Sequence, residues 1–329
     1  MTDRPQVGFL GVGWIGRDRM QAIAARDLVD IVAVADADGC AAAAAAEAVG
    51  ADVVDPDDVL TGPALDALVI ATPSALHAEQ AIAAFDAGLA VFCQKPLGRS
   101  AAETTAVVDA AARADRLLAV DLSYRHLAAT RRMREVLEEG AIGDVYAADL
   151  TFHNAYGPDK PWFLDRARSG GGCVIDLGTH LVDLAQWMLP GHELAVVASR
   201  LYAQGRPLRR PIEAVEDYAT VLLETSRGAT IDLACSWFLP AGRDAVIAAT
   251  FYGTEGAVAL ENVGGSFYDF RAVLRRGTQE EVLVSPPDAW GGRAAVEWAQ
   301  QLVADPRHRP DVGGDLVAVA TVVDEIYGR

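Results

Sequence analysis

The stretch VGFLGVGWIG, residues 7–16, carries the clearest structural signal in the chain. Its apolar start at 7–10 predicts a buried strand, and the residues that follow predict a helix over 14–28. The turn between them matches the pattern G-x-G-x-x-G, whose glycines allow a tight turn, close approach of backbone to a pyrophosphate, and close packing of helix on strand. The cofactor-binding residues expected in this turn are Gly11, Gly13, Trp14, Ile15 and Gly16.

Asp36 strengthens the prediction of a dinucleotide site. It lies 20 residues after Gly16, at the end of the next predicted strand (31–35), where an acidic residue can bind the adenine ribose. Its carboxylate repels a 2′-phosphate, and residues 37–49 contain no Arg or Lys to offset that repulsion. We therefore expect NAD rather than NADP. An ordinary glycine-rich turn without a ligand is the alternative for the whole motif.

The first third of the chain alternates apolar runs with helical stretches. Such runs are typical of parallel strands buried on both faces, so we expect a doubly wound α/β sheet in a Rossmann domain over 1–120. Ser100 is the expected N-cap of the last of its helices. The further strands are expected at 67–71 and 89–93, and the helices at 40–49, 75–87 and 101–114.

The remaining residues, 121–329, predict an α+β domain rich in antiparallel strands. In the strand at 229–237, apolar residues alternate with polar ones, which indicates one buried and one open face. The terminal helix is a candidate to pack back on the first domain. Further strands are expected at 144–152, 194–202, 217–224, 245–252, 256–261 and 267–276, and helices at 127–139, 176–189, 293–304 and 313–326.

Composition excludes several classes of protein. With 329 residues, 51% of them apolar, the chain is long enough for two cores, yet no uncharged apolar run approaches the roughly 18 residues of a membrane span. The net charge of −18 argues against a nucleic-acid or anionic-membrane partner. Four scattered cysteines and six histidines show no metal-type spacing, so we expect no metal site. The absence of a secretory signal and the dispersed thiols predict a cytoplasmic protein.

Lys95 is the first candidate for chemistry. Only two of the 28 basic residues are lysines, and Lys95 follows the strand at 89–93 in the sequence Gln94-Lys95-Pro96. Because the carboxyl ends of strands face the ligand crevice in a doubly wound sheet, the amine is expected beside the nicotinamide. Pro96 restricts the backbone of Lys95 and so helps to orient it. A surface lysine in a turn is the alternative.

Asp176 and His180 form a second cluster, behind the triple glycine at 170–172. On an α-helix they share one face, and a carboxylate one turn before an imidazole can orient the ring. The glycines leave room for a ligand or for a close backbone. A solvated helix face with a surface histidine explains the spacing equally well.

Taken together, these motifs resemble the glucose–fructose oxidoreductase/inositol dehydrogenase/MocA family over nearly the whole chain. Further markers are ATPSALH at 71–77 and DLGTH at 176–180. The resemblance implies a second domain with an open-faced, mostly antiparallel sheet that often mediates dimers or tetramers. It implies a catalytic Lys95, Asp176 and His180 acting on a sugar, polyol or cyclitol. The cofactor-binding residues that it adds are Thr72, Pro73, His77, Gln94 and Lys95.

Gln94 departs from the usual motif, which begins with Glu. Its neutral amide removes a charge that would favour protonated Lys95, and this leaves open whether Lys95 or His180 is the principal acid–base. Polar and aromatic residues at the domain junction and in the loop that follows the 144–152 strand are candidates to bind a hydroxylated ring. They are Tyr124, Arg125, His153, Asn154, Tyr156, Lys160 and Trp162.

Three functions fit these residues. The first is an NAD-dependent dehydrogenase or reductase, in which His180 removes a hydroxyl proton while Lys95 stabilises the oxygen and hydride leaves carbon. The second is a glycoside hydrolase that oxidises its substrate transiently and retains NAD. The third is a non-catalytic dinucleotide sensor, which would have no need for Lys95, Asp176 and His180.

Overall fold

The computed structural model describes residues 4–62 and 64–329, which form two compact units. The first unit runs to Ser123 and also includes Gly291–Val317, and the second comprises Tyr124–Trp290 and Ala318–Arg329. A single division at residue 120 therefore differs from the structure in the placement of 291–317. The reason is burial: Trp298 is 1% exposed and packs on Phe92 of the first unit, with ring centroids 5.6 Å apart.

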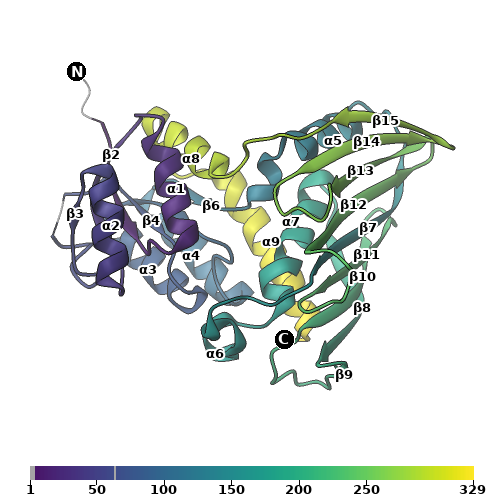
Figure 1. Ribbon diagram of the computed structural model, residues 1–329, viewed down its shortest axis with the longest axis horizontal. Coiled ribbons are helices and arrows are strands. Elements are labelled where there is room, and N and C mark those ends of the chain that lie inside the picture. Colours follow the sequence, from purple (N-terminus) through teal and green to yellow (C-terminus); the bar gives the residue numbers. More distant parts are fainter. Residues whose placement is uncertain (1–3, 63) are drawn as a thin grey trace. The chain divides into compact units, whose positions relative to one another are not determined.

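The first unit contains a six-stranded parallel sheet in the order β3-β2-β1-β4-β5-β6. This order reverses between β1 and β4, which is the crevice position at which doubly wound sheets bind ligands. The fold class expected for this part of the chain is confirmed. The strands are β1 (Gln6–Leu10), β2 (Asp30–Ala35), β3 (Asp52–Val53), β4 (Ala67–Ile70), β5 (Ala90–Cys93) and β6 (Leu118–Val120). Figure 1 labels β2, β3, β4 and β6.

Helices cover both faces of this sheet. In β4, Ala67 and Val69 pack with α1, α2 and α8, whereas Leu68 and Ile70 pack with α3 and α4. Both alternating sets are buried, which explains why the strands appear in the sequence as continuous apolar runs. Ser100 caps α4, because its hydroxyl accepts a hydrogen bond from the Glu103 N–H. The helices are α1 (Trp14–Ala24), α2 (Gly39–Val49), α3 (Ser74–Asp86), α4 (Ala101–Ala114) and α8 (Arg293–Ala304).

The second unit is built on a nine-stranded sheet in the order β15-β14-β13-β12-β7-β11-β10-β8-β9. The β7–β11 pair is parallel and the other neighbours are antiparallel, so the expected mostly antiparallel sheet is confirmed. Its strands are β7 (Val145–Asn154), β8 (Leu194–Ala203), β9 (Arg206–Pro207), β10 (Tyr218–Thr225), β11 (Thr230–Ser236), β12 (Ala245–Gly253), β13 (Gly256–Asn262), β14 (Phe270–Arg276) and β15 (Gln279–Val284).

One face of this sheet forms the core of the second unit. Ile231, Leu233 and Cys235 of β11 are buried there, together with apolar residues of α5, α7 and the last turns of α9. The helical segments of this unit and its junctions are η1 (Ser123–His126), α5 (Ala128–Glu138), η2 (Pro161–Leu164), α6 (Arg166–Ser169), η3 (Val174–Gly178), α7 (Thr179–Met188) and α9 (Pro310–Tyr327).

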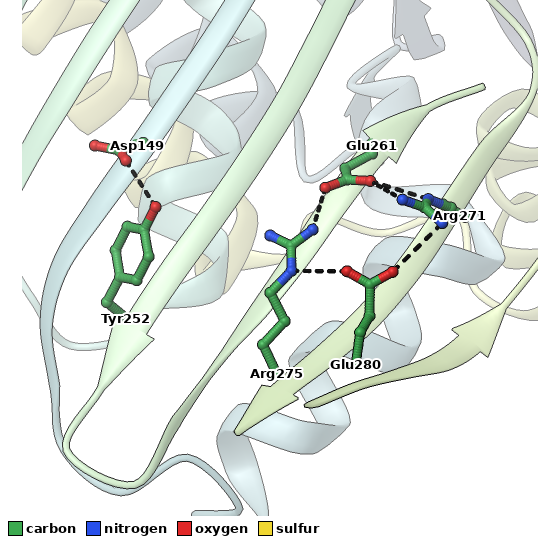
Figure 2. A network of polar contacts seen from close by, with 6 residues as sticks. All are labelled: Asp149, Tyr252, Glu261, Arg271, Arg275 and Glu280. Carbon is green, nitrogen blue, oxygen red and sulfur yellow. Dashed lines mark hydrogen bonds and ion pairs between the residues drawn. The ribbon is translucent and has the colours of Figure 1, made fainter. Parts of the chain in front are cut away.

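The other face carries polar side chains. Figure 2 shows Glu261 of β13, Arg271 and Arg275 of β14, and Glu280 of β15 as a closed ring of alternating charge. Nearby, the Tyr252 hydroxyl donates to Asp149 at 2.8 Å. Long polar side chains of neighbouring strands pair across this face. The sheet is therefore one-sided, with one face in the apolar core and the other open and polar, as the alternating pattern predicts.

The structure also differs from the sequence-based expectations. The helix expected over 176–189 begins with a π-helical turn, Val174–Gly178, so the α-helical spacing assumed for Asp176 and His180 does not hold at its start. Strands β3, β6, β9 and β15 were not expected. Among residues 4–62 and 64–329, no helix has the length and apolar character needed to cross a membrane.

Candidate active site

The glycine turn of the first unit has the shape that its motif predicts. Gly11 has a φ of +90°, and a Cβ there would lie 2.6 Å from the backbone of Ala71. A Cβ on Gly16 would lie 2.2 Å from the Gly11 carbonyl oxygen, whereas one on Gly13 would meet nothing within 4 Å. The chain is thus tight where helix packs on strand and open where a pyrophosphate would approach. Gly13 also gives α1 no side-chain cap, so no side chain competes for its first N–H groups.

The side chains around this turn differ in exposure. Trp14 is 70% exposed, and Ile15 is half-buried. Asp36 directly follows β2, and its two oxygens accept hydrogen bonds from the Val12 N–H at 2.7 Å and the Asp38 N–H at 2.8 Å. Each carboxylate oxygen keeps a second lone pair, which fits hydrogen bonds from ribose hydroxyls. The observed residues therefore fit a bound dinucleotide.

His77 braces the turns that follow β4 and β5. Its ring nitrogens lie 2.7 Å from the carbonyl oxygens of Thr72 and Pro96, and burial lowers the pKa of the imidazole. The Thr72 hydroxyl donates to Gln80 at 2.6 Å, and Pro73 is the N-cap residue of α3. The chain's own carbonyls thus occupy both nitrogens of His77, which connects the β4–α3 turn to the half-buried Lys95 and its cis bond to Pro96.

Gln94 belongs to a buried polar network that the sequence analysis missed. Its amide donates to Asp121 at 2.5 Å, and the same Asp121 oxygen accepts from Arg19 Nε at 2.6 Å. Ser123 bonds to the other oxygen of Asp121. All four side chains are buried. A donor at position 94 therefore suits the carboxylate beside it, whereas the Glu of the usual motif would face a second carboxylate.

Asp176 and His180 lie in a half-buried, aromatic part of the second unit. The Trp237 indole N–H donates to Asp176 Oδ2 at 3.1 Å. The His180 ring lies 5.0 Å from the Tyr124 ring and 6.3 Å from the Phe152 ring, measured between centroids. Asp176 sits in the π-turn and His180 in the first turn of α7. π-Turns are frequent at functional sites because they displace side chains from the regular helical positions.

Tyr124 is the expected substrate residue that the structure places beside His180. It is 8% exposed, and its ring also contacts Phe152, Phe270 and Trp290. Burial, followed by the charge of Asp176, raises the pKa of the Tyr124 hydroxyl well above its usual range. The hydroxyl is therefore protonated at physiological pH.

Arg125 points into a buried ion pair. Its guanidinium holds Asp183, whose side chain is 1% exposed, with Arg125 Nε at 3.0 Å from both carboxylate oxygens. This fork–fork arrangement fixes the entrance to α5 against α7 and gives Arg125 a structural role.

The other expected substrate residues are spread over the second unit. His153 lies on the sheet face opposite Phe152, and its Nδ1 is 2.7 Å from the Ser236 hydroxyl. Asn154 alternates back to the Phe152 face, and its Oδ1 is buried without a hydrogen-bond partner in the described part of the chain. Tyr156 is 51% exposed. Lys160 pairs with Asp159 at 3.4 Å on the surface.

Trp162, in the loop after β7, begins a series of aromatic contacts that leads to Asp176. It stacks on Phe163 with centroids 3.9 Å apart, and Phe163 lies 6.3 Å from Trp237. Trp237 is a functional residue that the sequence analysis did not single out, and the signal that could have found it is its position at the end of the alternating strand at 229–237. It also borders an open cavity of about 880 Å³, which Tyr202, Tyr218 and Phe238 line as well. No group of three or more potential metal ligands occurs in the described residues.

Comparisons with known proteins agree with both units. Residues 6–122 match a family described as an oxidoreductase family with an NAD-binding Rossmann fold, and residues 130–259 match the GFO/IDH/MocA C-terminal domain. D-apiose dehydrogenase of Paraburkholderia graminis is 30% identical over 296 residues, which cover 88% of this chain and 74% of that protein.

Two further relatives extend the comparison. Inositol 2-dehydrogenase 3 of Saccharopolyspora erythraea is 32% identical over 231 residues; the match covers 69% of this chain and 65% of that protein. The crystal structure of GenD2 from gentamicin A biosynthesis in complex with NAD superposes with a TM-score of 0.83 at 27% identity, covering 99% of this chain and 94% of GenD2. The chain therefore belongs to the Gfo/Idh/MocA family of oxidoreductases, and its first unit is an NAD-binding Rossmann fold.

Proposed function

We propose that this protein transfers hydride between NAD and a secondary alcohol or ketone carbon of a sugar, polyol or cyclitol. One observation carries the proposal: the π-turn and α7 hold Asp176 and His180, both half-buried, against the aromatic side chains of Tyr124 and Trp237. An imidazole beside flat aromatic surfaces suits proton exchange with a hydroxylated ring. Relatives named as inositol and D-apiose dehydrogenases support the substrate class.

Each catalytic residue has a distinct task in this proposal. His180 accepts the proton of the substrate hydroxyl, while Asp176, held on one oxygen by Trp237, orients the imidazole. The Lys95 ammonium donates a hydrogen bond to the same substrate oxygen and stabilises its developing negative charge. Bound NAD supplies the hydride acceptor, or as NADH the donor. The buried Tyr124 ring excludes water from one side of His180.

The first unit would hold the cofactor through the glycine turn and Asp36. Backbone N–H groups at the start of α1 face the pyrophosphate, and the free lone pairs of Asp36 accept the ribose hydroxyls. We propose a preference for NAD over NADP, because a 2′-phosphate would meet the Asp36 carboxylate. Thr72, Pro73 and the His77 brace shape the nicotinamide end of the crevice.

Assembly and location complete the proposal. We propose a homodimer or homotetramer formed through the open face of the nine-stranded sheet of the second unit. The four cysteines are free thiols, which supports a reducing, cytoplasmic location.

The two lysines provide a matched test. We expect Lys95→Met to lower kcat by about 10²- to 10³-fold and to leave NAD affinity nearly unchanged, because a donor to the reacting oxygen acts in the transition state. Lys160→Met removes the other lysine, whose side chain is 63% exposed, and should change KM but not kcat. The assay follows NADH absorbance with a panel of cyclitols, aldoses and keto-sugars in both directions. A near-wild-type kcat for Lys95→Met would contradict the proposed role.

A further inference from the structure

Glu216 is a wholly buried carboxylate that the proposed mechanism does not use. It lies two residues before β10 and is 0% exposed. Its Oε1 accepts hydrogen bonds from the Val174 N–H at 2.9 Å and the Tyr327 hydroxyl at 2.7 Å. The Gly172 N–H lies 3.0 Å from both carboxylate oxygens. A charge that is buried at this depth is retained in proteins only where several donors compensate it.

These contacts make Glu216 the cap of the helix that carries Asp176 and His180. The first N–H groups of a helix have no partner within the helix, and the side chain of Cys173, the N-cap residue here, makes no capping hydrogen bond. Glu216 supplies the acceptors from a segment distant in sequence: its carboxylate accepts from the N–H groups of residues 172 and 174, and its backbone oxygen accepts from the Cys173 N–H at 3.1 Å. A negative charge at this end also interacts favourably with the helix dipole.

The triple glycine exists to allow this close approach. A Cβ on Gly172 would lie 1.9 Å from the Glu216 carbonyl oxygen, and a Cβ on Gly171 would lie 2.1 Å from the Tyr327 hydroxyl. Neither separation is physically possible for a larger residue without movement of the loop. Of the two explanations that the sequence left open for these glycines, the structure supports the close backbone.

Tyr327 completes the cap from the last turn of α9. Its side chain is buried, and burial, together with the charge of Glu216, raises the pKa of its hydroxyl well above the usual range. The hydroxyl therefore remains a donor. Burial also raises the pKa of the Glu216 carboxyl, and the donors at Val174, Tyr327 and Gly172 oppose that effect. The C-terminal helix is thereby tied to the start of the π-turn.

Residues 216 and 217 also position Asp176, through Gly172 on one side and Trp237 on the other. The Asp176 N–H donates to the Gly172 carbonyl at 3.0 Å, so the capped loop sets its backbone. The neighbouring Asp217 carbonyl accepts from the Trp237 N–H at 2.7 Å, and the Trp237 indole donates to the Asp176 carboxylate. Residues 216 and 217 thus fix both the backbone and the carboxylate of Asp176.

We propose that Glu216 and Tyr327 form a positioning pair that caps the π-turn and sets Asp176 and His180 for proton transfer. This inference rests on the proposed function, because only the proposed function gives Asp176 and His180 a catalytic task. Displacement of an active-site group by about 1 Å can lower turnover about 100-fold. Loss of the pair should therefore appear in kcat for the alcohol, whereas NAD affinity, which depends on the glycine turn and Asp36, should stay within about twofold of wild type.

The test compares Glu216→Gln and Tyr327→Phe with Thr225→Val in the full chain. Thr225 is the buried last residue of β10, the strand that Glu216 precedes, and its hydroxyl oxygen accepts from the Ala229 N–H at 3.0 Å. We expect kcat to fall about ten- to a hundredfold in Glu216→Gln and less in Tyr327→Phe, with faster amide exchange at Gly172 and Val174. Thr225→Val should lower the Tm and leave kcat unchanged. Wild-type kcat and KM in Glu216→Gln and Tyr327→Phe, despite faster exchange at those amides, would overturn the positioning role.

His180→Ala, measured in parallel, separates this inference from the function on which it rests. Full turnover of His180→Ala would overturn the proposed function and the positioning role together. An inactive His180→Ala with fully active Glu216→Gln would overturn the positioning role alone. If Glu216→Gln does not fold, Tyr327→Phe decides, because it keeps the buried ring and removes one donor to the carboxylate.

Discussion

Replacement of Gln94 by glutamate would test the buried network at the end of β5. The Gln94 amide donates to Asp121 at 2.5 Å, so Gln94→Glu brings two carboxylates to that separation in a buried environment. With an effective dielectric constant of about 20, two unit charges this close repel by roughly 6–7 kcal/mol. At neutral pH the folded chain should instead protonate one of the two carboxyls, because neutralising a carboxyl of ordinary pKa about 4.3 at pH 7 costs only about 4 kcal/mol.

The penalty should therefore depend on pH. The folded-state pKa of the new carboxyl is raised above its unfolded value, so between those two values the folded chain holds an extra proton and stability falls as pH rises. The slope is about 1.4 kcal/mol per pH unit. We expect Gln94→Glu to destabilise the chain by about 4 kcal/mol at pH 7 and about 1 kcal/mol at pH 5, where the protonated carboxyl again donates to Asp121.

Urea unfolding of the full chain at both pH values measures this difference. Gln80→Glu is the matched control, because the Gln80 side-chain oxygen accepts from the Thr72 hydroxyl and a carboxylate keeps that acceptor. In the double variant Gln94→Glu/Asp121→Asn the new carboxylate faces an amide at position 121, and most of the lost stability should return. Equal penalties at pH 5 and pH 7, or no penalty at pH 7, would refute the account.

Three further substitutions test other parts of the structure. Arg125→Ala removes the guanidinium from the buried Asp183 and should destabilise the chain by about 3–5 kcal/mol in urea unfolding; a wild-type unfolding midpoint with a raised KM would instead give Arg125 a substrate role. Asp36→Ser removes the carboxylate that repels a 2′-phosphate and should lower the ratio of NADP to NAD dissociation constants; an unchanged ratio would contradict the cofactor assignment. Burial raises the pKa of Glu261, but the charges and hydrogen bonds of Arg275 and Arg271 outweigh it, so the pKa is lowered. The ring in Figure 2 therefore stabilises the fold at pH values above the ordinary glutamate pKa of 4.5, and this contribution is lost as the pH falls through the lowered pKa. The stability difference between wild type and Glu261→Gln should then shrink in acid, and a difference independent of pH would argue against the ring.

The architecture of the first unit could be predicted because its signals are local. Parallel strands buried on both faces appear as apolar runs, and the glycines at 11, 13 and 16 mark the turn that follows β1. The second unit was predictable as a one-sided sheet from alternation. Its edge strand β15, QEEVLV, was missed because its first half is acidic and exposed, which is how proteins protect edge strands from pairing.

Long-range partners account for most of what the sequence did not reveal. Asp183 looks like a member of a polar helix face, yet it is buried because Arg125 comes from a different segment. Alternation fixes that His153 and Asn154 lie on opposite faces of β7 but not which of them faces α7. Glu216 lies 44 residues from Gly172, and no pattern within either segment indicates that one caps the other.

The most direct test of the account is the fate of the hydrogen on the reacting carbon. We predict that, with a substrate from the cyclitol and sugar panel deuterated at the oxidised carbinol carbon, the label is recovered in the reduced nicotinamide. His180→Ala and Lys95→Met should slow this transfer strongly while still binding NAD. Reduced cofactor without the label, or transfer at the wild-type rate in either variant, would contradict hydride transfer by these residues.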